Sequence, residues 1–445
     1  MDSDLEFNAI IDEFLERTRP LIGLESTEDV PPPIPPALPE QVSPVPAALV
    51  LDEETIRRYA HSIGDDNPLF TDPAYGHASH HRSMIAPTPI LVHARYPADH
   101  GASRPHGYPF ANFIGGLAWE FFDVVRPGTR VTTSKVLREV QEVRGLDGHR
   151  LILLVCEVTY QDAFGRLLAK AYGTLVQVPM KMMGHTRAMP VEHVGEHLLN
   201  TRQTHRYTQT EVEAIVAGMR SERRRGKEPL YWEDVAVGDA LPAIYQPPYT
   251  LQDALCYQSL HQGLVAGYGG GRLARSFTPG YRVLKAGWGY PDFARVHPVT
   301  RWPYTPGDEH EDALLCTYRG QPLPFDFGIQ RAQIPQRLLT NWAGDMGFSR
   351  KMFMLMGRPL FHGDALIVRG AVTAKSTVTE PGSRQPHHSV RVTMEAFNQR
   401  GESVSRGFAT VYLPSRATGE APQPIRPASP PPYVPYDQHR SPAWY

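Results

Sequence analysis

The sequence predicts an α+β fold that is built twice within one chain. Three observations support this prediction. The chain has 445 residues, which is long for a single ordinary core. Its two halves share a repeated pattern of glycines, strand-like runs and a closing proline. Each copy also places one apolar segment with helical spacing before its strands, so that a sheet and a helix can share a core.

The repeat is visible in two pairs of segments. In the first half "VRPGTRVTTSKV" is followed by "VCEVTYQDAFGRLLAKAYGTLVQVP", and in the second half "LFHGDALIVRGAV" is followed by "VRVTMEAFNQRGESVSRGFATVYLP". Gly128 and Gly363 are 235 residues apart, and Pro179 and Pro414 have the same separation. Gly165 and Gly401 are 236 residues apart, and such a nearly constant offset across turns and strands predicts two copies of one structural unit.

Within each copy the runs predict antiparallel strands joined by tight turns. The turns fall at "AFGR" and "QRGE", and the flanking runs are β-branched with short-period apolar residues. The helix candidates are "LAWEFF" at 117–122 and "RLLTNWAGDMGFSRKMFMLM" at 337–356. A long antiparallel sheet wrapped around a buried helix is the hot-dog fold, so the sequence predicts a double hot-dog.

Proline-rich and charged stretches suggest the domain boundaries. We expect an N-terminal helical segment at 1–29, a Pro-rich connector at 30–49 and the first hot-dog unit at 50–180. A linker with a helix and a basic run follows at 181–228, and the second unit occupies 229–415. Residues 416–445, which end in "PASPPPYVPYDQHRSPAWY", are expected to form a disordered tail.

Composition excludes several classes of protein. The formal net charge is −2, which does not favour a general nucleic-acid or membrane surface. The start lacks the order of a signal peptide, and no apolar run is long enough to span a bilayer. The three cysteines are scattered, and "HASHH" has no completing ligand, so neither disulfides nor a metal site is predicted. A reducing cytoplasm is the simplest compartment.

The stretch "IRRYAHSIGDDNPLFTDPAYG" resembles the signature of MaoC-like (R)-specific enoyl-CoA hydratases and dehydratases. That pattern is a helix followed by Gly or Ser, Asp, any residue, Asn-Pro-Leu-His, any residue and Asp. Six positions agree with it: Gly64, Asp65, Asn67, Pro68, Leu69 and Asp72. "YWEDVAVGDALP" and "TNWAGDMGF" are similar to parts of two-domain acyl dehydratases, so the resemblance covers about residues 15 to 415.

The resemblance implies addition of water to the double bond of a 2-enoyl thioester. Asp65 would be the acid/base, and Asn67 would orient it and its loop. A backbone N–H at the start of the central helix would stabilise the thioester oxygen. No metal or redox cofactor is needed, because coenzyme A or phosphopantetheine is part of the substrate. Without the resemblance, Asp65 and Asn67 before Pro68 would be read as a helix end.

Phe70 stands where the signature has its His, and a phenyl ring cannot transfer a proton. In the second copy His310 and Asp312 resemble the end of the motif, although Thr305 stands where its Asp should be. Three explanations remain open: a composite site of Asp65 and His310, another acid, or lost or changed chemistry. The other acids considered are His77, His80, His81 and His93.

The substrate-binding candidates are Phe70, Trp342, Gly344 and Arg224. Gly344 in "NWAGDMG" would let a thioester approach the backbone closely. Arg224 belongs to a basic run that would receive coenzyme A phosphates or face a carrier protein, or would simply be a solvated linker face. The glycine run at 263–276 would form a lid or insertion beside the acyl pocket.

The sequence thus predicts a hydratase or dehydratase of an enoyl or 3-hydroxyacyl thioester of coenzyme A or a carrier protein. The alternatives are a non-catalytic double hot-dog partner subunit or acyl-binding protein, and a hot-dog thioesterase. The expected partners are that thioester and a second MaoC-like chain or a second copy of this one. Neither nucleic acid nor membrane is expected as a partner.

Overall fold

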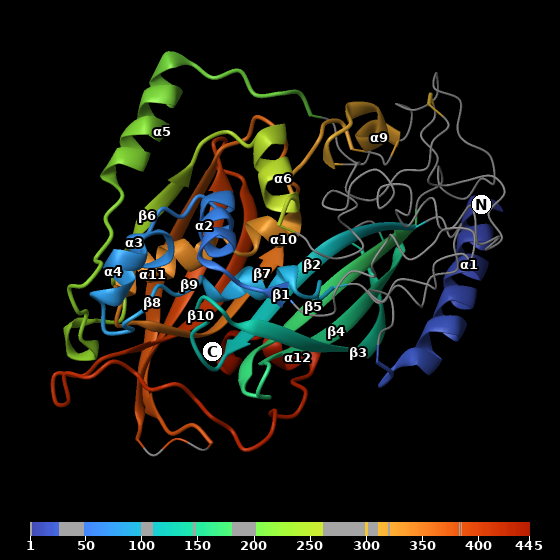
Figure 1. Ribbon diagram of the computed structural model, residues 1–445. Helices are drawn as coiled ribbons and strands as arrows, with labels where there is room; N and C mark the ends of the chain where they lie inside the picture. Colours follow the sequence, from blue (N-terminus) through green and yellow to red (C-terminus); the bar gives the residue numbers. More distant parts are fainter. Residues whose placement is uncertain are drawn as a thin grey trace, which may run out of the picture.

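A single ten-stranded antiparallel sheet runs through the molecule (Figure 1). The computed structural model describes residues 2–25, 49–98, 110–145, 148–179, 202–260, 299–300, 310–318, 321–381, 383 and 385–445. The strands are β1 (Leu49–Val50), β2 (Phe110–Phe121), β3 (Arg130–Arg144), β4 (Arg150–Asp162), β5 (Leu167–Pro179), β6 (Ala240–Gln246), β7 (Phe348–Met356), β8 (Leu366–Val378), β9 (His387–Asn398) and β10 (Ser403–Leu413).

The strand order confirms the doubled unit. It reads β1-β3-β4-β5-β2 and then β7-β10-β9-β8-β6, so each half is the reverse of the other. The halves join where β2 pairs with β7, from Gly116 opposite Leu355 to Glu120 opposite Lys351. Gly128 before β3 and Gly363 before β8 both have positive φ, as do Gly165 and Gly401 in the two hairpin turns. The fold is therefore a double hot-dog.

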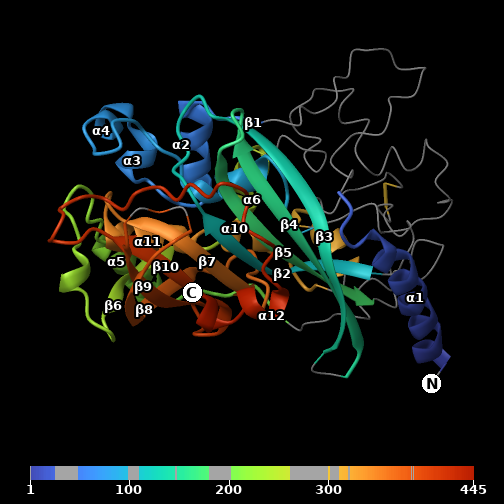
Figure 2. The ribbon, with the colours of Figure 1, turned by 90° about the horizontal axis from the view of Figure 1, so that it is seen from below.

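Helices lie over one face of the sheet and beside it (Figures 1 and 2). They are α2 (Glu53–Ser62), α3 (Pro68–Thr71), α4 (Pro73–His77), α6 (Leu251–Gln258), α9 (Ala313–Tyr318), α10 (Gly328–Arg331), α11 (Pro335–Ala343) and the 3-10 helix η2 (Thr88–His93). The main core joins α2, α6 and α11 to the inward side chains of both halves of the sheet. At the far end α1 (Asp2–Thr18), followed by η1 (Arg19–Leu21), packs Phe14 and neighbours against β3 and β4.

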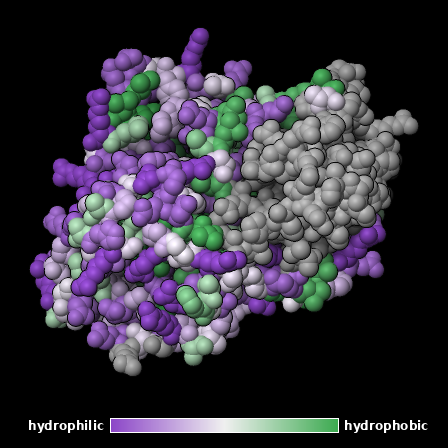
Figure 3. All heavy atoms as spheres, viewed as in Figure 1, coloured by the Kyte–Doolittle hydropathy of each residue, from purple (hydrophilic) through white to green (hydrophobic). Residues whose placement is uncertain are grey.

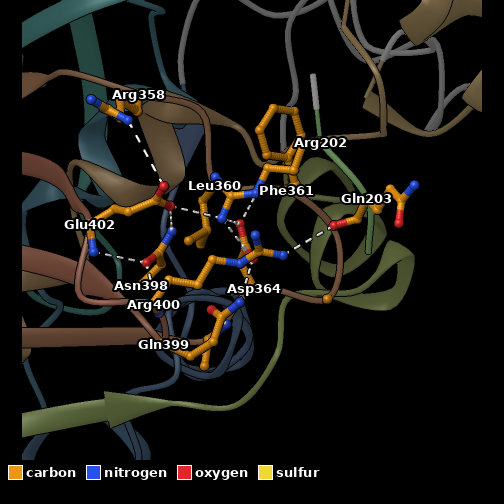
Figure 4. Close-up of polar contacts among 12 residues, drawn as sticks. Arg202, Gln203, Arg358, Leu360, Phe361, Asp364, Asn398, Gln399, Arg400 and Glu402 are labelled. Atoms are coloured by element: carbon orange, nitrogen blue, oxygen red, sulfur yellow. Dashed lines mark hydrogen bonds and ion pairs between the residues drawn. The ribbon is translucent and has the colours of Figure 1, made fainter. Parts of the chain in front are cut away.

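The linker contains the predicted helix, α5 (Gln209–Ser221), which is followed by η6 (Trp232–Asp234). The described part of the linker begins at Arg202, which forms ion pairs with Asp364 (3.3 Å) and Glu402 (2.9 Å) of the second unit (Figure 4). Arg400 also donates a hydrogen bond to the carbonyl of Gln203. The described part of the linker, from residue 202 on, is therefore held against the second unit.

Two helix predictions were wrong. "LAWEFF" lies in β2, and only the first part of "RLLTNWAGDMGFSRKMFMLM" is helical, because α11 ends at Ala343 and β7 begins at Phe348. β2 and β7 lie at the middle of the sheet, where Trp119 faces the helices and Ala118 faces the C-terminal segment. A strand that is buried on both faces reads as a continuous apolar run, which imitates a buried helix.

The C-terminal tail is also different from the prediction of disorder. Residues 416–445 follow the opposite face of the sheet and include α12 (Tyr436–His439) and η9 (Pro442–Trp444) (Figure 2). Lys170 donates to the carbonyls of Pro431 (2.7 Å) and Pro432 (3.0 Å), and His439 stacks on Tyr172. Aromatic residues spaced between the prolines provide the packing that a solvated tail lacks.

Some predictions concern residues outside this description. The Pro-rich connector lies almost entirely at 26–48, and the glycine run lies within 261–298, so neither is described. No helix in the described ranges is long and apolar enough to cross a bilayer. Seen from the side of Figure 1, hydrophilic residues cover most of the described surface, and hydrophobic ones gather only in small groups (Figure 3).

Candidate functional site

Asp65 lies in a tight turn at the C-terminal end of α2. The turn depends on Gly64, whose φ of +72° is a conformation that other residues adopt at a cost. A Cβ at Gly64 would also collide with the side chain of Gln246 from the second unit. The Asp65 amide then donates to the carbonyl of Ala60 at 2.8 Å, which directs the side chain back under the helix.

The Asp65 carboxyl is completely buried. Its Oδ1 accepts a hydrogen bond from the amide of Asn67 at 3.0 Å, whereas Oδ2 has no hydrogen-bond partner among the described residues. Burial raises the pKa of Asp65 to about 6, against the opposing influence of the Asn67 amide, Arg337 and Arg224. A carboxyl with a pKa near neutrality and one oxygen without a hydrogen-bond partner is suited to exchanging protons with a bound molecule.

Asn67 organises the same turn through its backbone and its side chain. Its amide holds Asp65, and its Oδ1 accepts from the Leu69 amide at 3.1 Å as the N-cap of α3. Pro68 then occupies the first helical position, where a missing N–H is tolerated. The helix-end reading and the functional reading of this motif are therefore both expressed in one structure.

Phe70 is buried in a cluster with Ala60, Leu69 and Ile85. Only 2% of its surface is exposed, so it packs beneath the turn as a core residue. The ring is enclosed by protein, and its contact with substrate stays a prediction. The space that the signature gives to an imidazole is filled here by hydrocarbon.

His310 of the second unit stands before a capping Asp, as Phe70 does in the first unit. Asp72 caps α4 by accepting from Ala74 at 2.9 Å, and Asp312 accepts in the same way from Leu314 at 2.8 Å as α9 begins. His310 stands two residues before its Asp, as Phe70 does. The local structure therefore agrees with the resemblance of His310 and Asp312 to the end of the motif.

The His310 ring packs between Phe325 and Phe327, with ring centroids at 4.4 and 4.0 Å. Its Nδ1 lies 3.0 Å from the Phe325 carbonyl. Phe327 precedes α10, and Gln330 of α10 in turn contacts the end of α2 just before Asp65. His310 and the Asp65 turn are therefore both linked to α10, His310 through Phe327 and the turn through Gln330.

The other histidines differ in their surroundings. His77 is exposed, whereas His80 and His81 lie together with ring centroids 3.7 Å apart. Burial lowers the pKa of His81 to about 3, so this ring is neutral near pH 7. His93 is buried between Tyr59 and Tyr257. Within the described ranges no group of three His, Cys, Asp or Glu residues is arranged to hold a metal ion.

Trp342, Gly344 and Arg224 gather around the C-terminal end of α11, but the linker covers this end. Gly344 has φ +72°, and a Cβ there would lie 2.9 Å from the carbonyl oxygen of Gly226. Arg225 donates to the Trp342 carbonyl at 2.9 Å, and Arg224 forms an ion pair with Asp66. The close neighbour of Gly344 is therefore the linker backbone, and the basic run joins parts of this chain.

Sequence reasoning missed a set of polar residues in the second unit, three of them buried and Gln246 half-buried. Gln330, Gln333 and Arg337 lie on or between α10 and α11, and Gln246 lies at the end of β6. Gln246, Gln330 and Arg337 donate to carbonyls of the first unit. Gln333 accepts from the Tyr59 hydroxyl of the first unit and donates to Tyr257. The signal was present in "GIQRAQIPQRLL", where glutamines and arginines recur at helical spacing in a segment that otherwise reads as core.

Comparison with known proteins adds independent information about the first unit. Residues 43–171 match the model of the FAS1-like dehydratase domain region. The resemblance to MaoC-like dehydratases is thereby confirmed. A curated relative, a UPF0336 protein from Clavibacter michiganensis subsp. michiganensis, is 25% identical over 146 residues, which are 32% of this chain and 95% of the relative.

One solved structure agrees with this chain in fold. A structure named MaoC-like dehydratase has a TM-score of 0.53 at 15% identity, and the match covers 83% of this chain and 95% of that one. A putative MaoC domain protein dehydratase from Chloroflexus aurantiacus J-10-fl has a TM-score of 0.45 at 14% identity, covering 83% of this chain and 93% of that one. The first of these extends the MaoC-like fold across both units.

Proposed function

We propose that this chain is a hydratase or dehydratase acting at the 2,3-position of an enoyl or 3-hydroxyacyl thioester. The observation that carries the proposal is the buried Asp65 carboxyl. One of its oxygens accepts a hydrogen bond from the Asn67 amide, and the other has no hydrogen-bond partner among the described residues. It stands inside the segment that matches the dehydratase model. Burial adjusts its pKa to about 6, so both protonation states are accessible near neutral pH.

In the hydration direction Asp65 accepts a proton from water while the water oxygen bonds to C3. The electrons of the double bond move toward the thioester carbonyl, and a proton is then delivered to C2. Asp65 can return the proton that it took. Alternatively His310 supplies the second proton in a composite site, and the proton left on Asp65 passes back to His310 through solvent before the next cycle. In either case one water is consumed and no external oxidant or reductant enters.

The substrate class follows from the chemistry. A thioester carbonyl withdraws electrons strongly enough to make C3 electrophilic, so a coenzyme A or carrier-protein thioester needs no metal or redox cofactor. We propose the cytoplasm as the compartment. A second copy of this chain or another MaoC-like chain is the proposed protein partner.

The decisive experiment follows the conjugated thioester absorbance of crotonyl-CoA and of a longer 2-enoyl-CoA. We expect absorbance loss without thiol release, and a decrease of about a hundredfold or more in the Asp65→Asn variant, because a general acid/base contributes this much. Asp66→Asn is the matched control. The Asp66 carboxyl is next in sequence to Asp65, but it is exposed and pairs with Arg224, so this variant should keep most of the wild-type rate. Equal rates in the two variants would contradict the role of Asp65.

One observation favours a second function, that of a non-catalytic partner subunit. Phe70 and Asp65 are both enclosed by protein, and the aromatic ring replaces the proton-transferring imidazole of the signature. This alternative predicts no absorbance change with either substrate and stable association with a chain that has the complete Asp and His pair. Release of free thiol would instead indicate a thioesterase.

A further inference from the structure

The turn that carries Asp65 is held from outside by the second unit. Three consecutive carbonyls, those of Ser62, Ile63 and Gly64, accept hydrogen bonds there. The last carbonyls of a helix have no partners within the helix and are usually satisfied by water or a local cap. Here Gln330 donates to Ser62 at 2.8 Å, Gln246 to Ile63 at 2.9 Å, and Arg337 to Gly64.

Arg337 is the charged member of this set, and it is itself rigidly held. It lies on α11 with 5% of its surface exposed. One guanidinium nitrogen donates to Gly64, while the other donates to the Tyr245 carbonyl at 3.0 Å and pairs with Glu222. The Glu222 carboxylate also accepts from the Tyr245 amide at 2.7 Å. A planar guanidinium with bound neighbours on both sides has little freedom to move.

We propose that Arg337 is a positioning residue for Asp65: held by Glu222 of the linker, its guanidinium fixes the Gly64 carbonyl and thereby the orientation of the next residue's carboxyl. The proposal deepens the hydratase function and rests on it. It also assigns a role to the second unit and to the linker, because α11 supplies Arg337 and the segment after α5 supplies Glu222.

The charges around Asp65 come from every element packed against it. Arg337 on α11 and Arg224 on the linker favour the ionised carboxylate, whereas Asp66 and burial oppose it. The Tyr59 hydroxyl on α2 is also within electrostatic range of Asp65 and stays protonated, since burial raises its pKa. Loss of the Arg337 charge removes one of the two cations that oppose burial, so the pKa of Asp65 should rise further.

The first test is the pH dependence of hydration by the full-length chain. In Arg337→Gln we expect the acidic limb of the rate profile to move up by about one pH unit. Arg337→Lys keeps the positive charge but loses the planar guanidinium with its two donating nitrogens. Its acidic limb should therefore lie at the wild-type pH, while kcat should be at least about tenfold below the wild-type value and KM unchanged. An unshifted limb in Arg337→Gln, or a wild-type kcat in Arg337→Lys, would overturn the proposal.

A second readout does not depend on activity. Unfolding is measured against pH for the wild type, Asp65→Asn, Arg337→Gln and the double variant. Two differences in unfolding free energy are followed against pH: wild type minus Asp65→Asn, and Arg337→Gln minus the double variant. Each difference stops changing above the folded-state pKa of the Asp65 carboxyl and so reports that pKa. When Arg337 is present, we expect the difference in unfolding free energy to level off above about pH 6. When Arg337→Gln is compared with the double variant, the difference should level off about one pH unit higher.

Arg331→Gln is the matched control. Arg331 is another buried arginine of the same helical layer, 3% exposed, and its carboxylate partner is Asp326 at 3.3 Å. The Arg331→Gln variant should lose about as much unfolding free energy as Arg337→Gln, but the pKa of Asp65 should stay at its wild-type value. If hydration is absent while Arg337→Gln shifts that titration, the hydratase function fails and the contact stands; if hydration is present and neither readout moves, the positioning role fails.

Discussion

At the scale of single residues, one position decides how far the signature can be followed. The residues that shape the turn, Gly64, Asn67 and Pro68, act through backbone geometry and could be read from the sequence. The fate of Phe70 could not, because it depends on Ile85 and Ala60, which fold against it from different segments. The protonation of Asp65 was equally hidden, since it follows from burial and from two distant arginines.

Restoring the signature by Phe70→His should destabilise the chain by about 1–3 kcal/mol, because a polar ring would replace a phenyl ring in an apolar cluster. Burial also disfavours the imidazolium, so the folded-state pKa of this new ring would fall below its unfolded value. Stability should therefore decrease further as pH falls through about 6.5. Urea unfolding at pH 8 and pH 5 checks both parts; Phe70→Leu is the control that should show no added loss at pH 5.

At the scale of elements, β2 shows why patterns mislead. Alternation predicts a strand only if one face is wet, and β2 is covered on both faces. The end of α11 was missed as well, although the glycine that stops the helix, Gly344 with positive φ, stands inside the segment predicted to be helical. The C-terminal segment misled in the opposite way, since its prolines suggested disorder while its Tyr433, Trp444 and Tyr445 pack on the sheet.

Deleting residues 430–445 should therefore be costly. Removal exposes the face of β5, β2 and β7 that carries Tyr172, Ala118 and Phe353. Burial of each large side chain contributes about 1.5–3 kcal/mol, offset by the entropy of ordering the segment, so we expect a net loss of at least about 3 kcal/mol. Thermal unfolding and binding of a hydrophobic dye measure this; an unchanged melting temperature with no added dye binding would contradict it.

At the scale of the whole molecule, the repeat of 235 residues predicted the doubling, but not how the units depend on each other. The β2–β7 ladder joins the sheets, and side chains at the end of β6 and on α10 and α11 hold the Asp65 turn. These contacts link residues far apart in sequence, such as Gly64 and Arg337. Local periodicity carries no information about such pairs.

We expect neither half to fold alone. Fragments 1–201 and 202–445 each expose an unpaired central strand and buried polar groups, so each should lack a cooperative unfolding transition. Mixing the two after joint refolding should recover the transition and the circular dichroism of the intact chain. A sharp melting transition from either fragment by itself would show that the units are independent.

The β2–β7 seam has a consequence for how such a protein can change over time. In a dimer of identical chains, every substitution appears in both copies, so losing a proton donor in one site loses it in the other. Joining the copies through one chain breaks this constraint while fixing their ratio at one to one. One half can then keep an acid where the other keeps a hydrocarbon ring. Here the first unit has Asp65 and Phe70, whereas the second unit has His310.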